Sequence, residues 1–386
     1  MKNNHPIYNL RFGLLCLSSL LFSSSYNLLI PELPGYLSGL GGSRYIGLII
    51  SLFTLTAGLS RPFSGLLTDK IGRKPVMIFG AMVCLVCGFL YPILGTVAGF
   101  LFLRLLHGFS TGFTPTAIAA YVSDIVPANR WGEAFGIQGV FFTSGLALGP
   151  ALGSTIKLYY SYDILFYSSS AMAFLSMLLL YRLRETLLEK NRFEWQMLKI
   201  SRNDIVSTAV FVPALITFLA YFAFGMVLTL IPDWSDFLGF ENKGSFFVAF
   251  TIASLTIRFL AGSASDKMGR KVVVQVGLFI LMGALLIMVF LQTKTGLLSA
   301  AVIYGLAMGV LSPALNAWTV DLSPSGERGK GISTMFIALE AGIGLGALLS
   351  GWYYQDNFQN IPHTMLGSAC LAVVGLVFLA YFKKRS

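Results

Sequence analysis

The chain of 386 residues is 55% hydrophobic and only 11% charged. A soluble domain carries about a quarter of its residues as Asp, Glu, Lys and Arg, and the few polar residues here could not cover a water-exposed surface. The formal net charge of +10 does not indicate nucleic-acid binding, because the basic residues are scattered singly between apolar runs. The composition therefore predicts a protein embedded in the lipid bilayer and excludes a water-soluble one.

Apolar windows of about 20 residues, the length that crosses a bilayer, recur along the whole chain. We predict twelve membrane-spanning helices near 12–31, 46–68, 76–95, 98–122, 133–156, 162–181, 206–231, 245–265, 272–292, 296–320, 331–352 and 363–382. The first window is too long for a signal peptide, so it is kept as a span. The pair Cys84 and Cys87 lies inside an apolar run and is interpreted as packing, with no metal site.

The Lys and Arg residues predict which side of the membrane each loop faces. If the amino terminus is cytoplasmic, 20 of the 27 lie in cytoplasmic segments. The exceptions lie in outer loops (Arg44, Lys157, Lys243 and Lys294) or within spans (Arg61, Arg104 and Arg258). This bias follows the positive-inside rule. We therefore expect a multi-pass protein of the cell membrane, the inner membrane where there are two, with both termini cytoplasmic.

The segment "DKIGRK" at 69–74 returns as "DKMGRK" at 266–271, 197 residues later. The same offset relates further pairs, among them Arg61 and Arg258, Asp124 and Asp321, Gly145 and Gly342, and Gly149 and Gly346. We predict a duplication: an N-terminal six-helix bundle at 1–181, a cytoplasmic central loop at 182–204 and a C-terminal six-helix bundle at 205–386. Because six is even, both bundles have the same orientation. The central loop is either an amphipathic helix on the inner membrane face or a solvated linker.

Each copy belongs to a longer pattern, G-x-x-x-D-[RK]-x-G-[RK]-[RK]. The residues that fit it are Gly65, Asp69, Gly72, Arg73 and Lys74 in the first copy, and Gly262, Asp266, Gly269, Arg270 and Lys271 in the second. Placed between spans two and three and between spans eight and nine, this pattern resembles the signature of the major facilitator superfamily. The resemblance implies an all-α fold of two six-helix bundles around a cavity lined by spans 1, 4, 5, 7, 10 and 11. It also implies transport of a small molecule by alternating access, without a cofactor.

The resemblance further implies how the repeated charges act. The expected networks are Asp69, Arg73 and Asp124 in the first half and Asp266, Arg270 and Asp321 in the second. They would hold the cytoplasmic side closed in the outward-facing state, through contacts between the halves that break during transport. Gly72 and Gly269 would let the chain turn sharply between two spans.

Span five reads "GLALGPALGS" at 145–154. Gly145, Gly149 and Gly153 form a stripe that permits close helix packing, and Pro150 bends the helix. The stretch resembles the antiporter signature of the superfamily, G-x-x-x-G-P-x-x-G-G, with Ser154 in place of the last glycine. "LPGYL" in the first half and "LFLRLLHGFSTG" in span four resemble the twelve-span drug:proton antiporters. The resemblance therefore favours export by proton antiport, although packing alone would also explain the glycines.

Few polar side chains lie deep in the predicted spans, and those that do are candidates for contact with protons or substrate: Asn27, Arg104, His107 and Glu340. Glu340 is the only acidic residue well inside a span, so it would be protonated or would find a cation. We expect Arg104 to be the cation that keeps it ionised. His107 either carries a proton or is a neutral hydrogen-bonding residue. Arg61 and Arg258 are expected to bind backbone carbonyls at the inner gate.

No enzyme is indicated by the sequence. "GIGLGALL" at 342–349 imitates a dinucleotide fingerprint but lies in a predicted span with no preceding strand. No metal cluster or nucleophile–base arrangement stands out. The alternative function is a proton-coupled importer of sugars or organic acids on the same fold. The expected partners are a small-molecule substrate, protons and the lipid bilayer, with no nucleic acid and no second copy of the chain.

Overall fold

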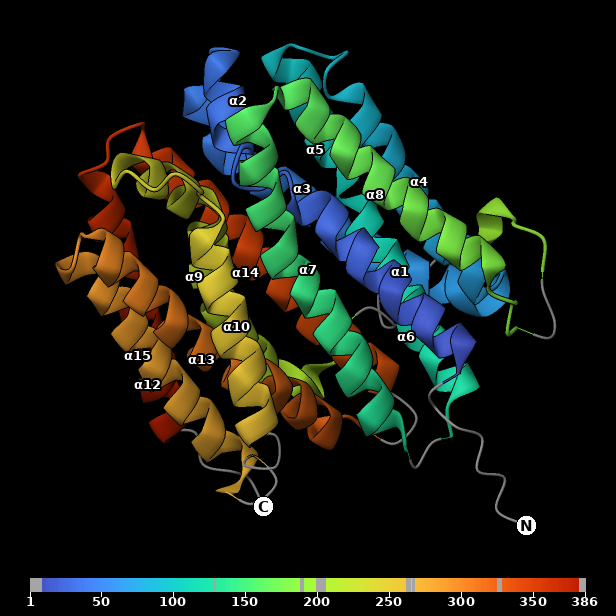
Figure 1. The fold of residues 1–386 in the computed structure, drawn as a ribbon. Helices are drawn as coiled ribbons and strands as arrows, with labels where there is room; N and C mark the ends of the chain where they lie inside the picture. The colour runs from blue at the N-terminus through green and yellow to red at the C-terminus, as the bar shows by residue number, and fades with distance from the viewer. Residues whose placement is uncertain are drawn as a thin grey trace.

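The computed structural model describes residues 9–127, 130–187, 191–198, 206–261, 265, 268–324 and 328–381, and this part of the chain is all-helical (Figure 1). The helices are α1 (Leu10–Asn27), α2 (Leu33–Gly39), α3 (Ile46–Lys70), α4 (Arg73–Leu90), α5 (Val97–His107), α6 (Phe109–Ile125), α7 (Trp131–Tyr159), α8 (Tyr162–Arg182), α9 (Phe211–Phe237), α10 (Ser245–Ala261), α12 (Arg270–Phe290), α13 (Lys294–Leu322), α14 (Arg328–Tyr354) and α15 (Asn360–Tyr381). Short 3-10 turns lie at Ser43–Tyr45, Trp195–Leu198 and Thr208–Val210.

Nine helices in the described ranges are long and apolar enough to cross a membrane: α3, α4, α7, α8, α9, α12, α13, α14 and α15. Three predicted spans have another form. The span at 12–31 is the shorter α1, which ends before Pro31 and Pro34 because proline cannot donate to a helix. The span at 98–122 is divided at Gly108 into α5 and α6, and the span at 245–265 is the 17-residue α10. The count of twelve spans and the duplication stay predictions.

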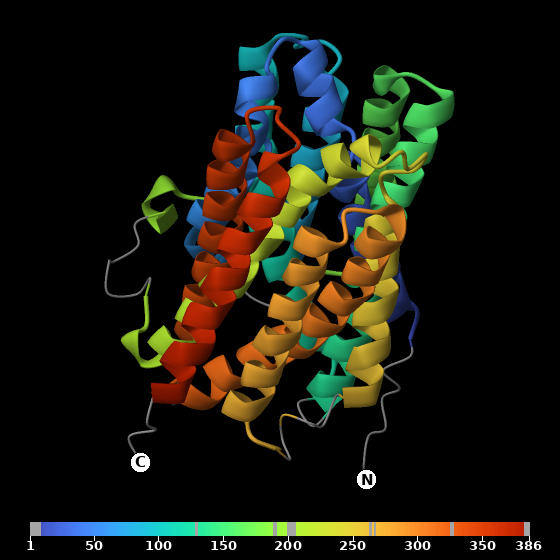
Figure 2. The same cartoon turned by 90° about the vertical axis from the view of Figure 1, so that its left-hand side faces the viewer.

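The helices before and after the central loop pack mainly among themselves. In the first group, α1 packs against α7 and α8, α4 against α6 and α8, and α3 against α6. In the second, α9 packs against α14 and α15, α12 against α13 and α15, and α10 against α13. Figures 1 and 2 show the first group in blue to green and the second in yellow to red. Two further pairs join the groups, α3 with α14 and α7 with α10. We call these the α3–α14 seam and the α7–α10 seam.

Both copies of the repeated motif lie at one end of the molecule, which we call the motif end. Helix α3 ends there at Lys70. Helix α14 begins at the same end because it packs antiparallel to α3: a Cβ on Gly47 would lie 3.2 Å from Gly351 Cα, and farther along α3 Arg61 bonds to Glu340. Helix α13 ends beside the start of α14, and its Asp321 pairs with the first residue of α12, Arg270. The turns into α4 and α12 therefore share an end.

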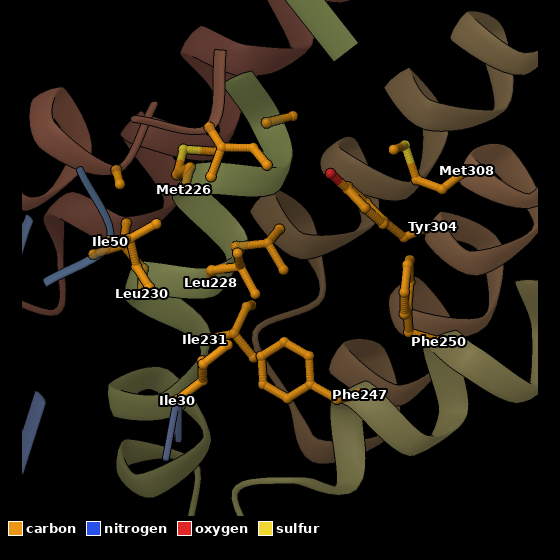
Figure 3. Packing of buried hydrophobic residues seen from close by; sticks show 14 of the residues in the cluster. Ile30, Ile50, Met226, Leu228, Leu230, Ile231, Phe247, Phe250, Tyr304 and Met308 are labelled. Atoms are coloured by element: carbon orange, nitrogen blue, oxygen red, sulfur yellow. The ribbon is translucent and has the colours of Figure 1, made fainter. Parts of the chain in front are cut away.

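Apolar side chains close the opposite end. Ile30 and Ile50 of the first group lie in one buried cluster with Leu230, Ile231 and Phe247 of the second, as Figure 3 shows. Ile30 lies in the turn between α1 and α2, and the other four lie in the parts of their helices farthest from the motif end. A second buried cluster lies within the first group of helices, in α1, α3, α4, α6, α7, α8 and the segments that follow α6 and α8, and its residue on α3 is Leu67. The two groups are thus held together by apolar packing at the end opposite the motifs.

The turns between α3 and α4 and between α10 and α12 each require a glycine. Gly72 has φ +120° and Gly269 has φ +88°, a region that other residues rarely adopt. Each glycine directly precedes the first residue of the next helix. A side chain at either position would strain the backbone.

Candidate functional site

An ion pair crosses the α3–α14 seam about halfway along both helices. Arg61 Nη2 donates to Glu340 Oε1 at 2.8 Å, and the two side chains are only 12% and 8% exposed. The Arg61 guanidinium also lies 4.6 Å from the centre of the Phe336 ring. The helices come this close because Gly58 faces Glu340, where a Cβ would lie 3.2 Å from the Glu340 Cβ. The expectation that Arg61 binds backbone carbonyls is therefore wrong, since its partner is a carboxylate in the other group of helices.

Glu340 lies where four helices approach one another. Besides Arg61 of α3, Tyr26 of α1 and Tyr221 of α9 are within electrostatic range of its carboxylate. A buried carboxylate is expensive unless it is paired and hydrogen-bonded, and the Arg61 guanidinium does both. The sequence could have suggested this pair, because it has few charges inside apolar runs, but only the fold brings together residues that are 279 positions apart.

Arg104 is not the cation beside Glu340. Its Nε donates to the Ile49 carbonyl at 2.8 Å, its Nη1 lies 3.5 Å from Tyr91 Oη, and its guanidinium lies 4.6 Å from the centre of the Phe53 ring. These partners belong to α3 and to the end of α4, and Arg104 is 2% exposed. The expectation that Arg104 keeps Glu340 ionised is wrong, because α5 places this arginine within its own group of helices.

His107 is fully buried and has a partner at each ring nitrogen. Nδ1 lies 3.2 Å from Tyr91 Oη, and Nε2 lies 3.3 Å from Cys84 Sγ. The ring also packs edge-on against Phe53. A neutral ring fits these contacts, as in the alternative of a hydrogen-bonding histidine, because one ring nitrogen can accept from the Tyr91 hydroxyl while the other donates to Cys84 Sγ.

The glycine stripe of α7 packs against α1. A Cβ on Gly145 would lie 2.6 Å from Ser23 Cβ, one on Gly149 would lie 2.9 Å from Asn27 Cβ, and one on Gly153 would meet the Leu28 carbonyl. Asn27 itself is buried, and its Nδ2 donates to the Ser23 carbonyl at 2.8 Å. The stripe therefore fixes the distance between α1 and α7.

The other residues of the antiporter stretch contact different partners. The Pro150 backbone lies beside Gly244, the residue directly before α10, where a Cβ would be 2.5 Å from the Pro150 carbonyl carbon. Ser154, which replaces the last glycine of the signature, donates to Glu32 Oε1 at 2.8 Å, with both side chains buried. Pro150 thus belongs to the α7–α10 seam, and Ser154 ties α7 to the segment between α1 and α2.

The charges of the first motif copy form the expected network. Arg73 Nε bonds to Asp124 Oδ2 at 2.9 Å, and Arg73 Nη1 lies 3.2 Å from Asp69 Oδ1. Lys74 Nζ donates to the Tyr181 carbonyl at 2.7 Å. A residue that the sequence did not indicate completes the site: both carboxylate oxygens of Glu185 accept from the backbone N–H groups of Arg73 and Lys74, each at 3.0 Å. Glu185 therefore caps α4 from a distance of more than a hundred residues, which no local pattern reveals.

The second copy repeats part of this arrangement. Arg270 Nε bonds to Asp321 Oδ2 at 2.8 Å, and Arg270 Nη1 donates to Ser265 Oγ at 2.6 Å. Lys271 follows Arg270 in the first turn of α12. Gly262 and Asp266 lie outside the described residues, and a Cβ on Gly65 would meet nothing within 4 Å. In this conformation the ion pairs recorded for the described motif residues lie within each half, and the expected contacts between halves are not among them.

Comparison with known proteins places this geometry in a family. A model of the Major Facilitator Superfamily matches residues 15–246 and 213–386. The chain is 26% identical over 384 residues to the multi-drug resistance efflux pump PmrA homolog of Lactococcus lactis subsp. lactis (strain IL1403), covering 94% of this chain and 93% of that protein. It is 25% identical over 375 residues to multidrug resistance protein 2 of Bacillus subtilis (strain 168), covering 93% and 91%.

Solved structures share the fold at lower identity. The human organic anion transporter MFSD10 (TETRAN) superposes with a TM-score of 0.74 at 20% identity, covering 95% of this chain and 98% of that one. The nucleoside transporter NupG superposes with a TM-score of 0.78 at 18% identity, covering 97% and 100%. The resemblance carried by the repeated motif is confirmed: this chain is a multi-pass membrane protein that belongs to the major facilitator superfamily of transporters.

Proposed function

We propose that the protein exports a small organic molecule from the cell in exchange for protons. The relatives named as multidrug efflux and resistance proteins, which match nearly the whole chain, support export. The glycine–proline stretch of α7 supports antiport by its resemblance to the antiporter signature. The observation that carries the proton coupling is the buried Arg61–Glu340 pair, a titratable group at the contact between the two groups of helices.

The conformation has the features of an inward-facing state. The contacts between the two groups of helices lie at mid-height and at the end opposite the motifs. With the motif end in the cytoplasm, as the distribution of Lys and Arg favours, the outer side is closed. Residues 1–181 and 205–386 would then be two bundles that rock about the seams, joined by the central loop at 182–204.

In this state the Arg61 guanidinium stabilises Glu340 as a carboxylate, so the proton has left toward the cytoplasm. When the outer end opens, α3 moves away from α14 and Glu340 loses its cation. A buried carboxylate without a partner takes up a proton, which now comes from the outside. Protonation removes the negative charge that holds a cationic or hydrogen-bonding part of the substrate, and the substrate leaves outward.

Everted membrane vesicles test this proposal. An exporter accumulates substrate in them at the expense of an inward-acid gradient, whereas uptake into whole cells would support the proton-coupled importer. Glu340→Gln should abolish gradient-driven accumulation but leave substrate exchange, which needs no net proton movement, partly intact. His107→Gln is the matched control and should keep the gradient response. A Glu340→Gln variant that still responds fully to the pH gradient would exclude this carboxylate as the proton carrier.

A further inference from the structure

Helix α10 carries a partly buried arginine, Arg258, that has no counter-charge among the residues that the structure describes. The Arg258 Nε is buried and has no hydrogen-bond partner, and no ion pair recorded within the described ranges includes this side chain. An unpaired charge deep in a membrane protein is costly and is found where it faces a partner or a functional cavity. Arg258 therefore needs an anion that the residues described by the structure do not supply.

The α3–α14 seam shows what is missing. Arg258 stands 197 positions after Arg61, and the helix contacts match at the same offset: Gly47 packs against Ala347, and Gly244 packs against Pro150. The position that corresponds to Glu340 is Thr143 of α7. A threonine hydroxyl can accept a hydrogen bond but carries no charge. The two seams thus offer the same cation, and only one of them offers a carboxylate.

Polar groups beside Tyr221 could hold part of a ligand. Tyr221 is within electrostatic range of both Arg258 and Glu340. Tyr221 also lines a small cavity of about 40 Å³ between α9, α13 and α14. The lining includes the polar residues Thr217, Ser312 and Asn316 beside the apolar Met335, Phe336 and Leu339, and Phe336 is the ring that Arg61 covers. The space admits one small polar group in this conformation but not a whole drug-sized molecule.

We propose that Arg258, with Tyr221, binds an anionic group of the transported molecule. The group would be a carboxylate, sulfonate or phosphate, whose oxygens accept the parallel N–H donors of a guanidinium. The substrate is then an organic anion, or a zwitterion whose cationic part faces Glu340. The inference rests on the proposed transport function and adds the substrate class.

The test measures binding to the purified protein and exchange in proteoliposomes without a pH gradient. The probes are a fluorescent organic anion, zwitterion and cation of similar size. Arg258→Gln should weaken the affinity for the anion or the zwitterion at least about tenfold, the scale of a lost charged hydrogen bond, and leave the affinity for the cation unchanged. Arg258→Lys keeps the charge and should bind with intermediate affinity, which separates loss of the site from loss of the fold.

A second variant supplies the missing partner. Thr143→Glu places a carboxylate at the position that corresponds to Glu340 and should compete with the anionic probe for Arg258. Unchanged affinity for the anion and the zwitterion in Arg258→Gln, or wild-type protein that binds only the cation or none of the probes, overturns the inference. The proposed proton coupling fails separately, if Glu340→Gln keeps its pH response while Arg258→Gln loses the anionic probe.

Discussion

The two seams are built alike but are charged differently. In the α3–α14 seam a buried Arg–Glu pair spans the contact, with 2.8 Å between Arg61 Nη2 and Glu340 Oε1. In the α7–α10 seam the recorded polar contacts are neutral: Asn242 Nδ2 donates to the Ala151 carbonyl and to Thr155 Oγ1, each at 3.1 Å. One seam can therefore respond to a proton. The other is held by packing and neutral hydrogen bonds, so any charge that neutralises Arg258 must come from elsewhere.

The difference between the two arginines predicts the largest effect. Arg61→Gln leaves Glu340 buried without a cation, and removing one partner of a buried pair costs about 3–5 kcal/mol. Arg258→Gln removes a charge that has no ion-pair partner among the described residues and should leave the free energy of unfolding unchanged or raise it. Thermal unfolding of the two variants in the same detergent measures this contrast. The double variant Arg61→Gln/Glu340→Gln should be more stable than Arg61→Gln alone. Equal losses from Arg61→Gln and Arg258→Gln would contradict the asymmetry of the seams.

A larger side chain at the closest contact should, by contrast, destabilise both seams to the same extent. A Cβ on Gly47 would lie 2.7 Å from the Ala347 carbonyl oxygen, and one on Gly244 would lie 2.5 Å from the Pro150 carbonyl. Gly47→Val and Gly244→Val should each destabilise the closed end opposite the motifs by about 1–3 kcal/mol, as overpacking does elsewhere. Gly283→Ala, where a Cβ meets nothing within 4 Å, is the control.

A cysteine at position 30 reports whether the end opposite the motifs has opened. Ile30 is buried at the closed end opposite the motifs, and Cys370 is exposed, so the background carries Cys370→Ser. Labelling of Ile30→Cys by an impermeant thiol reagent should rise in both valine variants and stay at the starting level in Gly283→Ala. A rise in only one of the two valine variants would show that the seams are not equivalent in packing.

Sequence patterns predicted those features that depend on residues close together in the chain. The turns at Gly72 and Gly269 follow from residues within a few positions, because a short turn between two helices needs a positive φ. The partner of Arg61 depended on how α3 crosses α14, and spacing does not encode that crossing. The cap that Glu185 gives to α4 likewise joins segments far apart in the chain. The partners of Arg104 were missed for the same reason: the side chain is buried, but the sequence does not show that helix packing directs it toward Ile49 and Tyr91.

The smallest change in stability is expected at the motif end, from the exposed carboxylate of Asp69. The Asp69 side chain is 72% exposed, so its pair with Arg73 contributes at most about 1 kcal/mol in this conformation. Asp69→Asn should therefore leave the unfolding temperature nearly unchanged. If the network closes the cytoplasmic side in the outward-facing state, that state loses about 1–3 kcal/mol of charged hydrogen bonds and its population falls between about five- and a hundredfold. In Asp69→Asn, labelling of Ile30→Cys should fall by that factor, and transport should fall with it. Asp163 is an exposed carboxylate at the start of α8, and Asp163→Asn, the control, should change neither. Normal transport with unchanged labelling in Asp69→Asn would leave the motif with a role in membrane topology alone.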